Sequence, residues 1–258
     1  MYNEALRGEK ELKLCEDGTH TLYSKEFEEY YHSTKDGALH ESLEKHVKPA
    51  FSFQKHKKKL VILDICFGLG YNTFSTLYYI QKHQLDIYIH ILSPEFDEAL
   101  LRSLASFIYP PEFDSLKPMI KAISENLFYE DEKCKIEILL GDARKSIPKI
   151  KEKIDIVYQD AFSPTQNPLL WTKEHFESIW AIVNEDVILT TYSISASVRL
   201  GLYENGFYIF IHSAFLMRDS TVASLCMLEN IDSIDMELKK MRNPKAKSLK
   251  DDAFLLTK

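Results

Sequence analysis

The sequence predicts an α/β protein built on a doubly wound, Rossmann-like sheet that is mostly parallel and ends in an antiparallel pair of strands. Three observations indicate this fold class. Five apolar strand-like runs alternate with helical segments, as expected of parallel strands joined by crossovers. The first run, LVILDIC at residues 60–66, is apolar nearly throughout, which is typical of a strand buried on both faces. The last two strand-like runs are separated by a short loop of about seven residues, which favours a hairpin.

A small N-terminal extension is expected to precede the sheet, over residues 1–56. ELKLCE and THTLY alternate polar and apolar residues around Asp17 and Gly18, a pair that favours a tight turn, so this segment predicts a β-hairpin. Residues 26–56 are expected to be helical in part, with an interruption near Asp36 and Gly37.

The sheet is expected to occupy residues 57–230, and a helical, basic tail the remaining residues 231–258. The expected strands are residues 60–66, 86–93, 134–140, 154–160, 186–192, 206–214 and 220–230. The expected helices between them are residues 72–83, 94–108, 115–128, a short segment ending near Ile150, 172–183 and 195–206. Their predicted boundaries are Asn72 or Thr73 as the first N-cap, the break at Pro110 and Pro111, Thr172 as a later N-cap, and Gly206 as a C-terminal stop.

Composition limits the possible classes of protein. At 258 residues, with 45% hydrophobic residues, the chain fits one α/β domain with extensions. Its apolar runs are far shorter than the roughly 18 residues of a membrane span, and its charged N-terminus has no apolar signal core, so a cytoplasmic protein is expected. The four cysteines are widely spaced, which indicates reduced thiols, and no histidine pair has metal-ligand spacing, so no metal is expected.

The net charge of −7, from 32 basic and 39 acidic residues, argues against a large nucleic-acid footprint. Basic residues nevertheless gather at 55–59, 144–153 and 239–250. Solvated helix faces and a tail are the favoured explanation of these stretches, and one basic binding face on an acidic protein is the alternative.

Four predicted strands in succession end in or next to a carboxylate. These are Asp64, Glu95, Asp142 and Asp160. In a doubly wound sheet ligands bind at the carboxyl ends of the strands, so the four acids are candidate ligand contacts. One such acid commonly caps the next helix, whereas four together with a glycine turn at the first strand indicate a cofactor site.

The glycine turn CFGLGYN, with Gly68 and Gly70, does not identify the cofactor alone. It lacks the GK[ST] of a nucleotide triphosphate loop and the third glycine of a dinucleotide turn. Glu95 suits a ribose diol, which both NAD and S-adenosylmethionine possess. The other acids favour S-adenosylmethionine, since Asp142 suits its adenine amino group and Asp64 its ammonium. Aromatic rings tolerate its sulfonium, and Tyr158, Phe162 and Tyr192 are placed for that role or for the core.

Several motifs together resemble the methyltransferase domain of the MnmC family, which acts on the wobble uridine of tRNA. The family's turn GFGxGxN corresponds to CFGLGYN in this chain, with Cys66 in place of the usual first glycine. The family's ISFE corresponds to LSPE, which ends at Glu95, and its GD corresponds to Gly141-Asp142. The most specific match is DAFSPTQNPLLWT at residues 160–172. LTTYSISASVRLGLYENGF and the upstream SKEFEEYYHSTKDGALHE are also similar. Gln166 stands where a lysine is expected.

The resemblance implies a Rossmann-like methyltransferase sheet that transfers a methyl group from S-adenosylmethionine to 5-aminomethyl-2-thiouridine, giving 5-methylaminomethyl-2-thiouridine. The flavin oxidase domain fused to many members is not expected in this chain, so a separate flavin-dependent oxidase is a candidate partner. The cofactor-binding residues expected are Asp64, Cys66, Phe67, Gly68, Gly70, Asn72, Glu95, Asp142, Ala143 and Asp160. The substrate-binding residues expected are Tyr31, Glu41, Phe162, Ser163, Pro164 and Tyr192.

Asp160 is the expected catalytic residue, as a hydrogen-bond acceptor or general base for the amine. An alkylamine with a pKa of about 10 costs roughly 4 kcal/mol to deprotonate at pH 7, so its lone pair needs such a partner. Trp171 is expected either to stack on a base or to anchor its own helix. Tyr31 and Glu41 are expected either to close over the site or to pack a lid helix.

Three alternatives remain open from the sequence. A methyltransferase of the same fold acting on a small-molecule or protein amine shares the cofactor site and suits the acidic charge. An aminopropyltransferase is disfavoured because a more glycine-rich turn is expected of it. A catalytically silent cofactor-binding module is disfavoured by the intact block at Asp160.

Overall fold

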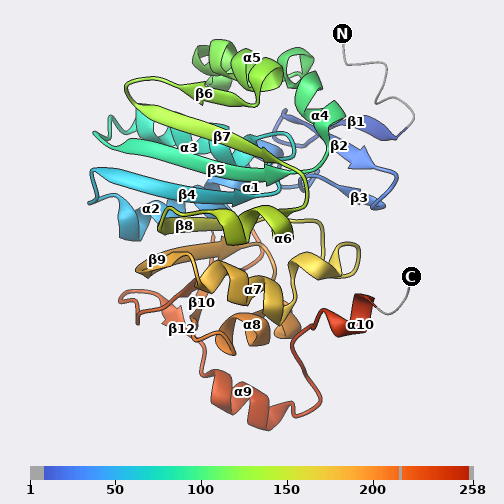
Figure 1. Cartoon of the computed structure of the whole chain (residues 1–258), viewed down its shortest axis with the longest axis vertical. Helices are drawn as coiled ribbons and strands as arrows, with labels where there is room; N and C mark the ends of the chain where they lie inside the picture. Colours follow the sequence, from blue (N-terminus) through green and yellow to red (C-terminus); the bar gives the residue numbers. More distant parts are fainter. Residues whose placement is uncertain (1–8, 215–216, 256–258) are drawn as a thin grey trace.

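The computed structural model describes residues 9–214 and 217–255, in which a nine-stranded sheet forms the centre of the fold (Figure 1). The strand order is β12-β10-β11-β9-β8-β4-β5-β7-β6. The parallel strands are β4 (Lys59–Ile65), β5 (Tyr88–Glu95), β7 (Cys134–Leu140), β8 (Ile154–Gln159) and β9 (Val183–Thr191). The antiparallel strands are β6 (Phe128–Glu130), β10 (Tyr208–His212), β11 (Ser220–Ser224) and β12 (Asp232–Ser233). The predicted fold class, with its antiparallel pair β10–β11, is confirmed.

Helices cover both faces of the sheet because its central strands are apolar on both faces. In β4, every residue from Leu60 to Ile65 is buried. One face packs against α1 (Ala38–Ser42), α2 (Lys48–Gln54), α3 (Tyr71–Lys82), α4 (Glu98–Ser103) and α5 (Lys117–Asn126). The other face packs against α6 (Ala143–Ser146), α7 (Lys173–Trp180) and α8 (Ala196–Tyr203). Short 3-10 turns lie at Leu104–Ser106, Pro111–Leu116, Ile147–Lys149 and Pro168–Leu170.

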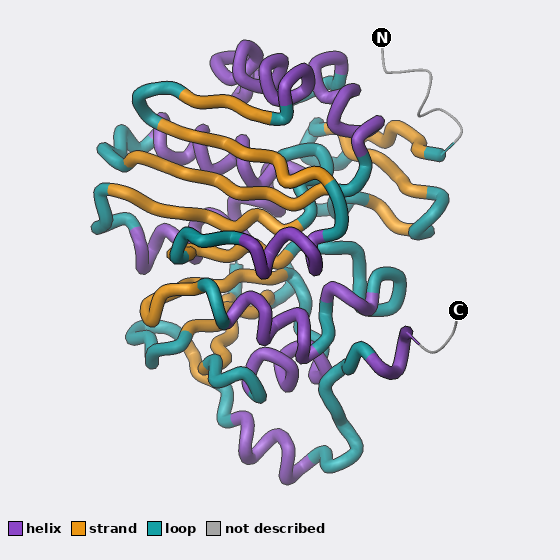
Figure 2. Tube along the Cα trace, in the orientation of Figure 1, coloured by secondary structure: helices purple, strands orange, loops and turns teal. Residues whose placement is uncertain are grey.

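The N-terminal extension forms a separate three-stranded sheet beside the carboxyl ends of the central strands (Figure 2). Its strands are β1 (Lys10–Leu14), β2 (His20–Ser24) and β3 (Glu29–Tyr30). The predicted hairpin around Asp17 and Gly18 is therefore confirmed, whereas β3 was not predicted. The expected interruption is also present, since α1 begins after Gly37, where a side chain would collide with Asp17.

Two predicted helix starts differ from the structure, and one strand was not predicted. The N-cap of α3 is Gly70, in a left-handed conformation with φ of 73°, so the prediction of Asn72 or Thr73 was wrong. Both side chains instead bond to carboxylates at the strand ends. The helix after β5 begins at Glu98 with Asp97 as its cap, because Pro94 and Glu95 still belong to the strand. The short strand β6 was missed.

The segment after β11 returns to the sheet and then to α7. β12 pairs with β10, and α9 (Met236–Arg242) follows it. Further on, the backbone N–H of Lys173 donates to the carbonyl of Leu249, before α10 (Asp252–Leu255). Thr172 caps α7 as predicted, by accepting from the N–H of His175. Among the described residues, no helix has the length and apolar character needed to cross a membrane.

Candidate active site

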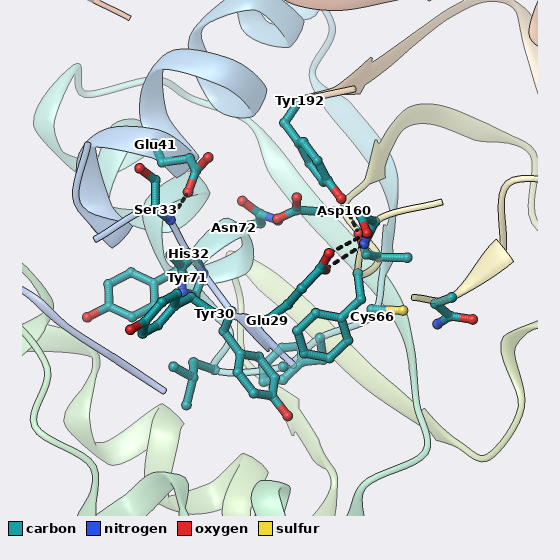
Figure 3. Close-up of a pocket in the computed structure, with 18 of the residues that line it drawn as sticks. Glu29, Tyr30, His32, Ser33, Glu41, Cys66, Tyr71, Asn72, Asp160 and Tyr192 are labelled. Carbon is teal, nitrogen blue, oxygen red and sulfur yellow. Dashed lines mark hydrogen bonds between the residues drawn. The ribbon is translucent and has the colours of Figure 1, made fainter. Parts of the chain in front are cut away.

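A cavity of about 390 Å³ lies at the carboxyl ends of β4, β5 and β8, between the central sheet and the N-terminal extension (Figure 3). Its wall combines the glycine turn after β4, the end of β5, the loop after β8 and the segment around β3. The predicted site residues that line it are Tyr31, Glu41, Cys66, Phe67, Gly68, Asn72, Glu95, Asp160, Phe162, Ser163 and Tyr192. The structure therefore brings together residues from five parts of the chain, since Tyr192 follows β9.

Five predicted site residues do not line this cavity: Asp64, Gly70, Asp142, Ala143 and Pro164. Asp64 is buried beneath the glycine turn. Asp142 borders a neighbouring hollow, where its carboxylate caps α6 and pairs with Arg144 at 3.0 Å. Ala143 is buried in the core of that face. Their roles toward a cofactor remain predictions.

The turn after β4 has three residues with positive φ: Cys66 at 68°, Gly68 at 52° and Gly70 at 73°. Gly70 is required by packing as well as by its conformation, because a Cβ there would lie 2.5 Å from Phe74 and 2.8 Å from Phe67. Cys66 adopts the same left-handed conformation with a side chain, which is strained for any residue other than glycine. The departure of Cys66 from the family's glycine therefore has a backbone cost.

Glu95 closes the cavity at the end of β5 and fixes the glycine turn. One carboxylate oxygen accepts from the backbone N–H of Gly68 at 2.8 Å, and the other accepts from the N–H groups of Phe96 and Asp97, each at 2.9 Å. Burial raises the pKa of Glu95, and these three hydrogen bonds oppose the rise. A carboxylate has about four acceptor positions, so Glu95 retains capacity for a hydroxyl on the cavity side.

Asp160 lies at the end of β8 with its carboxylate between two polar side chains. Asn72 of α3 donates to Oδ2 at 2.8 Å, and Nε2 of His46 lies 3.4 Å from Oδ1. Burial acts to raise the pKa of Asp160, but the neighbouring charge of His46 and the hydrogen bonds outweigh it and lower the pKa to about 2. Asp160 is therefore a charged acceptor in the wall of the cavity.

Asp64 lies close behind Asp160, but its pKa is shifted in the opposite direction. Its Oδ2 accepts from the hydroxyl of Thr73 at 2.7 Å, while its buried Oδ1 has no hydrogen-bond partner among the described residues. Burial raises the pKa of Asp64 to about 7, and the charge of Asp160 adds to the rise. A buried oxygen without a hydrogen-bond partner is unfavourable, and a positively charged group of a ligand would supply the missing partner. The same positive charge would favour the ionised form of this carboxyl group.

The N-terminal extension covers the cavity through contacts that the sequence analysis missed. Both the backbone N–H and the hydroxyl of Ser163 donate to the carboxylate of Glu29. Phe27 stacks on Phe162 with ring centroids 4.6 Å apart, and Tyr31 meets the same ring edge-on at 4.9 Å. Tyr31 and Glu41 therefore belong to the wall of the site. Glu29 lies within the family-like stretch SKEFEEYYHSTKDGALHE but was not predicted as a site residue, whereas His46 lies outside every quoted motif, so no sequence signal pointed to it.

Of the aromatic residues expected near the site, some line the cavity and others belong to the hydrophobic core. Tyr192 lines the cavity and donates through its hydroxyl to the carbonyl of Ala161 at 2.9 Å. Tyr158 is fully buried, so it belongs to the core. Trp171 is also fully buried, and its Nε1 donates to the carbonyl of Phe162 at 2.7 Å. Of the two roles for Trp171, the structure supports anchoring.

The charge of the cavity wall distinguishes the candidate cofactors. Among the described residues, the carboxylates that line it are Glu29, Glu41, Glu95 and Asp160, and the cationic side chain that lines it is Lys35. An excess of negative charge repels the diphosphate of a dinucleotide and attracts a cation. S-adenosylmethionine carries a sulfonium and an ammonium against one carboxylate, so the residues present fit this cofactor.

Comparisons with known proteins agree with S-adenosylmethionine as the cofactor of this site. Residues 114–225 match a family model described as an S-adenosyl-L-methionine-dependent methyltransferase. The crystal structure of MnmC2 from Aquifex aeolicus is similar with a TM-score of 0.80 and 34% sequence identity, over 95% of this chain and 79% of that one.

Two curated relatives are longer than this chain. An uncharacterized protein of Methanocaldococcus jannaschii is 32% identical over 79% of this chain and 56% of its own length. The tRNA 5-methylaminomethyl-2-thiouridine biosynthesis bifunctional protein MnmC of Azoarcus sp. is 28% identical over 77% of this chain and 32% of its own length. The chain thus spans about half of the first and a third of the second. From its motifs, its sheet and the match to the Aquifex structure, the chain belongs to the MnmC methyltransferase family, whose members have the Rossmann-like fold and use S-adenosylmethionine.

Proposed function

We propose that this protein methylates the primary amine of 5-aminomethyl-2-thiouridine at the wobble position of tRNA, giving 5-methylaminomethyl-2-thiouridine. The observation that carries the proposal is Asp160, a charged acceptor in the wall of a negatively charged cavity, followed directly by the specific block at residues 160–172. The names of the curated MnmC relatives support the choice of tRNA as substrate.

Different residues of this chain would bind different parts of the cofactor. Glu95 would bind the ribose hydroxyls, Gly68 and Cys66 would allow the backbone to approach, and Asp64 with Asn72 would hold the ammonium end. Asp142 and Ala143 would border the adenine, which requires Asp142 to share its contact with Arg144. When bound, S-adenosylmethionine supplies a methyl group that is activated for nucleophilic attack by the positive charge on its sulfur.

Asp160 acts on the substrate amine as an acceptor that orients it. An alkylamine enters mostly as an ammonium ion, which an ionised carboxylate binds. The ammonium ion must lose one proton to solvent before its lone pair can attack, and Asp160 then accepts a hydrogen bond from the neutral amine and orients it. The low pKa of Asp160 makes it a weak base, so alignment accounts for most of its effect, and positioning alone is worth several kcal/mol in such displacements. Phe162, Ser163 and Tyr192 would wall the amine, with Pro164 shaping the loop behind them.

A methyltransferase acting on a small-molecule or protein amine is the second candidate. The specific observation in its favour is charge, because the net charge of −7 opposes binding of a polyanionic RNA while the acidic cavity accepts any amine. A separate flavin-dependent oxidase as a partner remains a prediction.

Methyl transfer from labelled S-adenosylmethionine into tRNA that carries 5-aminomethyl-2-thiouridine tests the proposal, with nucleoside mass spectrometry to locate the methyl group. We expect transfer by the wild type and a loss of at least about 100-fold in kcat for Asp160→Asn at saturating S-adenosylmethionine. Asp86→Asn is the matched control, because Asp86 is exposed at the opposite end of the sheet. Methylation of polyamines or proteins without methylation of this tRNA would instead establish the second candidate.

A further inference from the structure

His46 is a buried histidine that borders the site without lining the cavity. It lies in a π-helical segment, Leu43–Val47, between α1 and α2, and its side chain is about 1% exposed. Single π-helical turns are rare and occur mostly at functional sites. The wider helical turn here places the imidazole against β8 and β9, where it meets the ring of Tyr158 edge-on at 5.7 Å.

Both nitrogens of His46 point at polar groups on these strands. Nδ1 lies 3.0 Å from the hydroxyl oxygen of Thr190, and Nε2 lies 3.4 Å from Oδ1 of Asp160. Nε2 is fully buried and has no hydrogen-bond partner among the described residues. A buried imidazole nitrogen that faces a carboxylate carries the proton, because two acceptors would repel each other.

The hydroxyl of Thr190 fixes the orientation of the His46 ring. A threonine hydroxyl donates to Nδ1 when the imidazole is neutral and accepts from Nδ1–H when it is protonated. The contact is therefore kept in both states, and the ring keeps its orientation toward Asp160. Asn72 holds the other oxygen of Asp160, so the carboxylate is fixed from both sides.

We propose that His46 is a positioning residue for methyl transfer, which acts through Asp160 by holding its carboxylate ionised and turned toward the cavity. The inference deepens the proposed function and rests on it for the identity of the amine. His46 touches neither cofactor nor substrate, since it lies behind Asp160.

Other titratable groups also lie around His46. They are Tyr158 of β8, Asp160 directly after β8, Asp64 of β4, His32 of the N-terminal extension and His212 of β10. Burial lowers the pKa of both His32 and His212, which keeps these rings neutral at pH 7. Of these three histidines, His46 is the one that lies against the carboxylate of Asp160, at 3.4 Å.

The first experiment follows the Asp160 carboxyl group by carbon-detected NMR in protein labelled at aspartate, with Asp160→Asn to assign the resonance. It needs no substrate. We expect the Asp160 signal to titrate at least one pH unit higher in His46→Phe than in the wild type. His46→Gln, whose amide still donates to Asp160, should give an intermediate value. His90→Phe is the control, because His90 is also buried beside a carboxylate, that of Glu137, on another part of the sheet.

The second experiment measures kcat/KM with the amine-bearing tRNA. We expect His46→Phe to lower kcat/KM at least about tenfold at pH 7.0 because the Asp160 carboxylate is no longer held toward the cavity, with partial rescue in His46→Gln. An unchanged kcat/KM in His46→Phe, or an unchanged Asp160 titration, would overturn the inference. If the wild type leaves tRNA unmethylated, the proposed function fails and the NMR titration alone decides the role of His46. Thr190→Val serves if His46→Phe does not fold, and it should shift the titration in the same direction.

Discussion

Ser163 donates two hydrogen bonds, from its backbone N–H and its hydroxyl, to the single carboxylate of Glu29, across 134 residues of sequence. The contact joins the N-terminal sheet to the loop that carries the family's most specific motif. Because Glu29 and Phe27 both meet this loop, the extension forms one wall of the active site rather than an appendage.

Glu29→Gln should therefore weaken the closed site. An amide replaces one carboxylate oxygen with a donor, so one bond from Ser163 is lost, and hydrogen bonds to charged groups contribute about 1.5–3 kcal/mol. We expect the dissociation constant for S-adenosylmethionine, measured by calorimetry, to rise roughly tenfold. Glu26→Gln, on the exposed turn before β3, is the control and should bind like the wild type. Equal affinity in both variants would show that the contact does not hold the cavity closed.

Asp64 should make cofactor binding depend on pH. Its pKa of about 7 in the free protein means that it gains a proton as the pH falls, and it then loses the charge that attracts an ammonium ion. Affinity for S-adenosylmethionine should fall by up to about tenfold per pH unit below 7 and level off above it. Asp64→Asn should bind more weakly with little dependence on pH. A wild-type dissociation constant that is constant from pH 5.5 to 8.0 would exclude this role.

The backbone cost at Cys66 can be measured against a second strained position. Gln84 also has a positive φ, of 51°, but is exposed, so Gln84→Gly relieves strain without losing buried contacts. Urea denaturation should show Gln84→Gly to be more stable by about 0.5–1 kcal/mol, and Cys66→Gly to gain less because the half-buried thiol is lost. Cys66→Val should destabilise by about 2 kcal/mol, since a β-branched residue suits this conformation least. A Cys66→Val protein as stable as the wild type would contradict the assigned strain.

Trp171→Phe separates anchoring from stacking. Removal of Nε1 leaves the carbonyl of Phe162 without this partner, at a cost of about 1–3 kcal/mol in the free energy of unfolding. Since the indole anchors the loop, kcat/KM should fall by the same factor for full-length tRNA and for a short anticodon stem-loop. Trp180→Phe is the control, because Trp180 is half exposed on α7. Unchanged stability with a loss confined to one RNA substrate would indicate contact with the RNA instead.

The parts of the fold that the sequence predicted are those with a local pattern. β4 is an apolar run buried on both faces, the hairpin β1–β2 alternates around Asp17 and Gly18, and Thr172 precedes a helix that it caps. The cap of α3 was mispredicted because Asn72 and Thr73 look like capping residues, while their side chains are taken by Asp160 and Asp64. Tertiary hydrogen bonds outweighed a local preference.

By itself, the sequence determined the α/β order, the acids at the strand ends and the family, because each depends on periodicity or on short contiguous motifs. Only the tertiary structure decided which acids share a cavity, and it left Asp142 outside while adding Glu29. It also decided the state of two neighbouring carboxyl groups, since the pKa of Asp64 is raised to about 7 and that of Asp160 lowered to about 2. The physical reason is that burial and charged neighbours set a pKa, and the neighbour that matters most to Asp160, His46, comes from a distant helical turn.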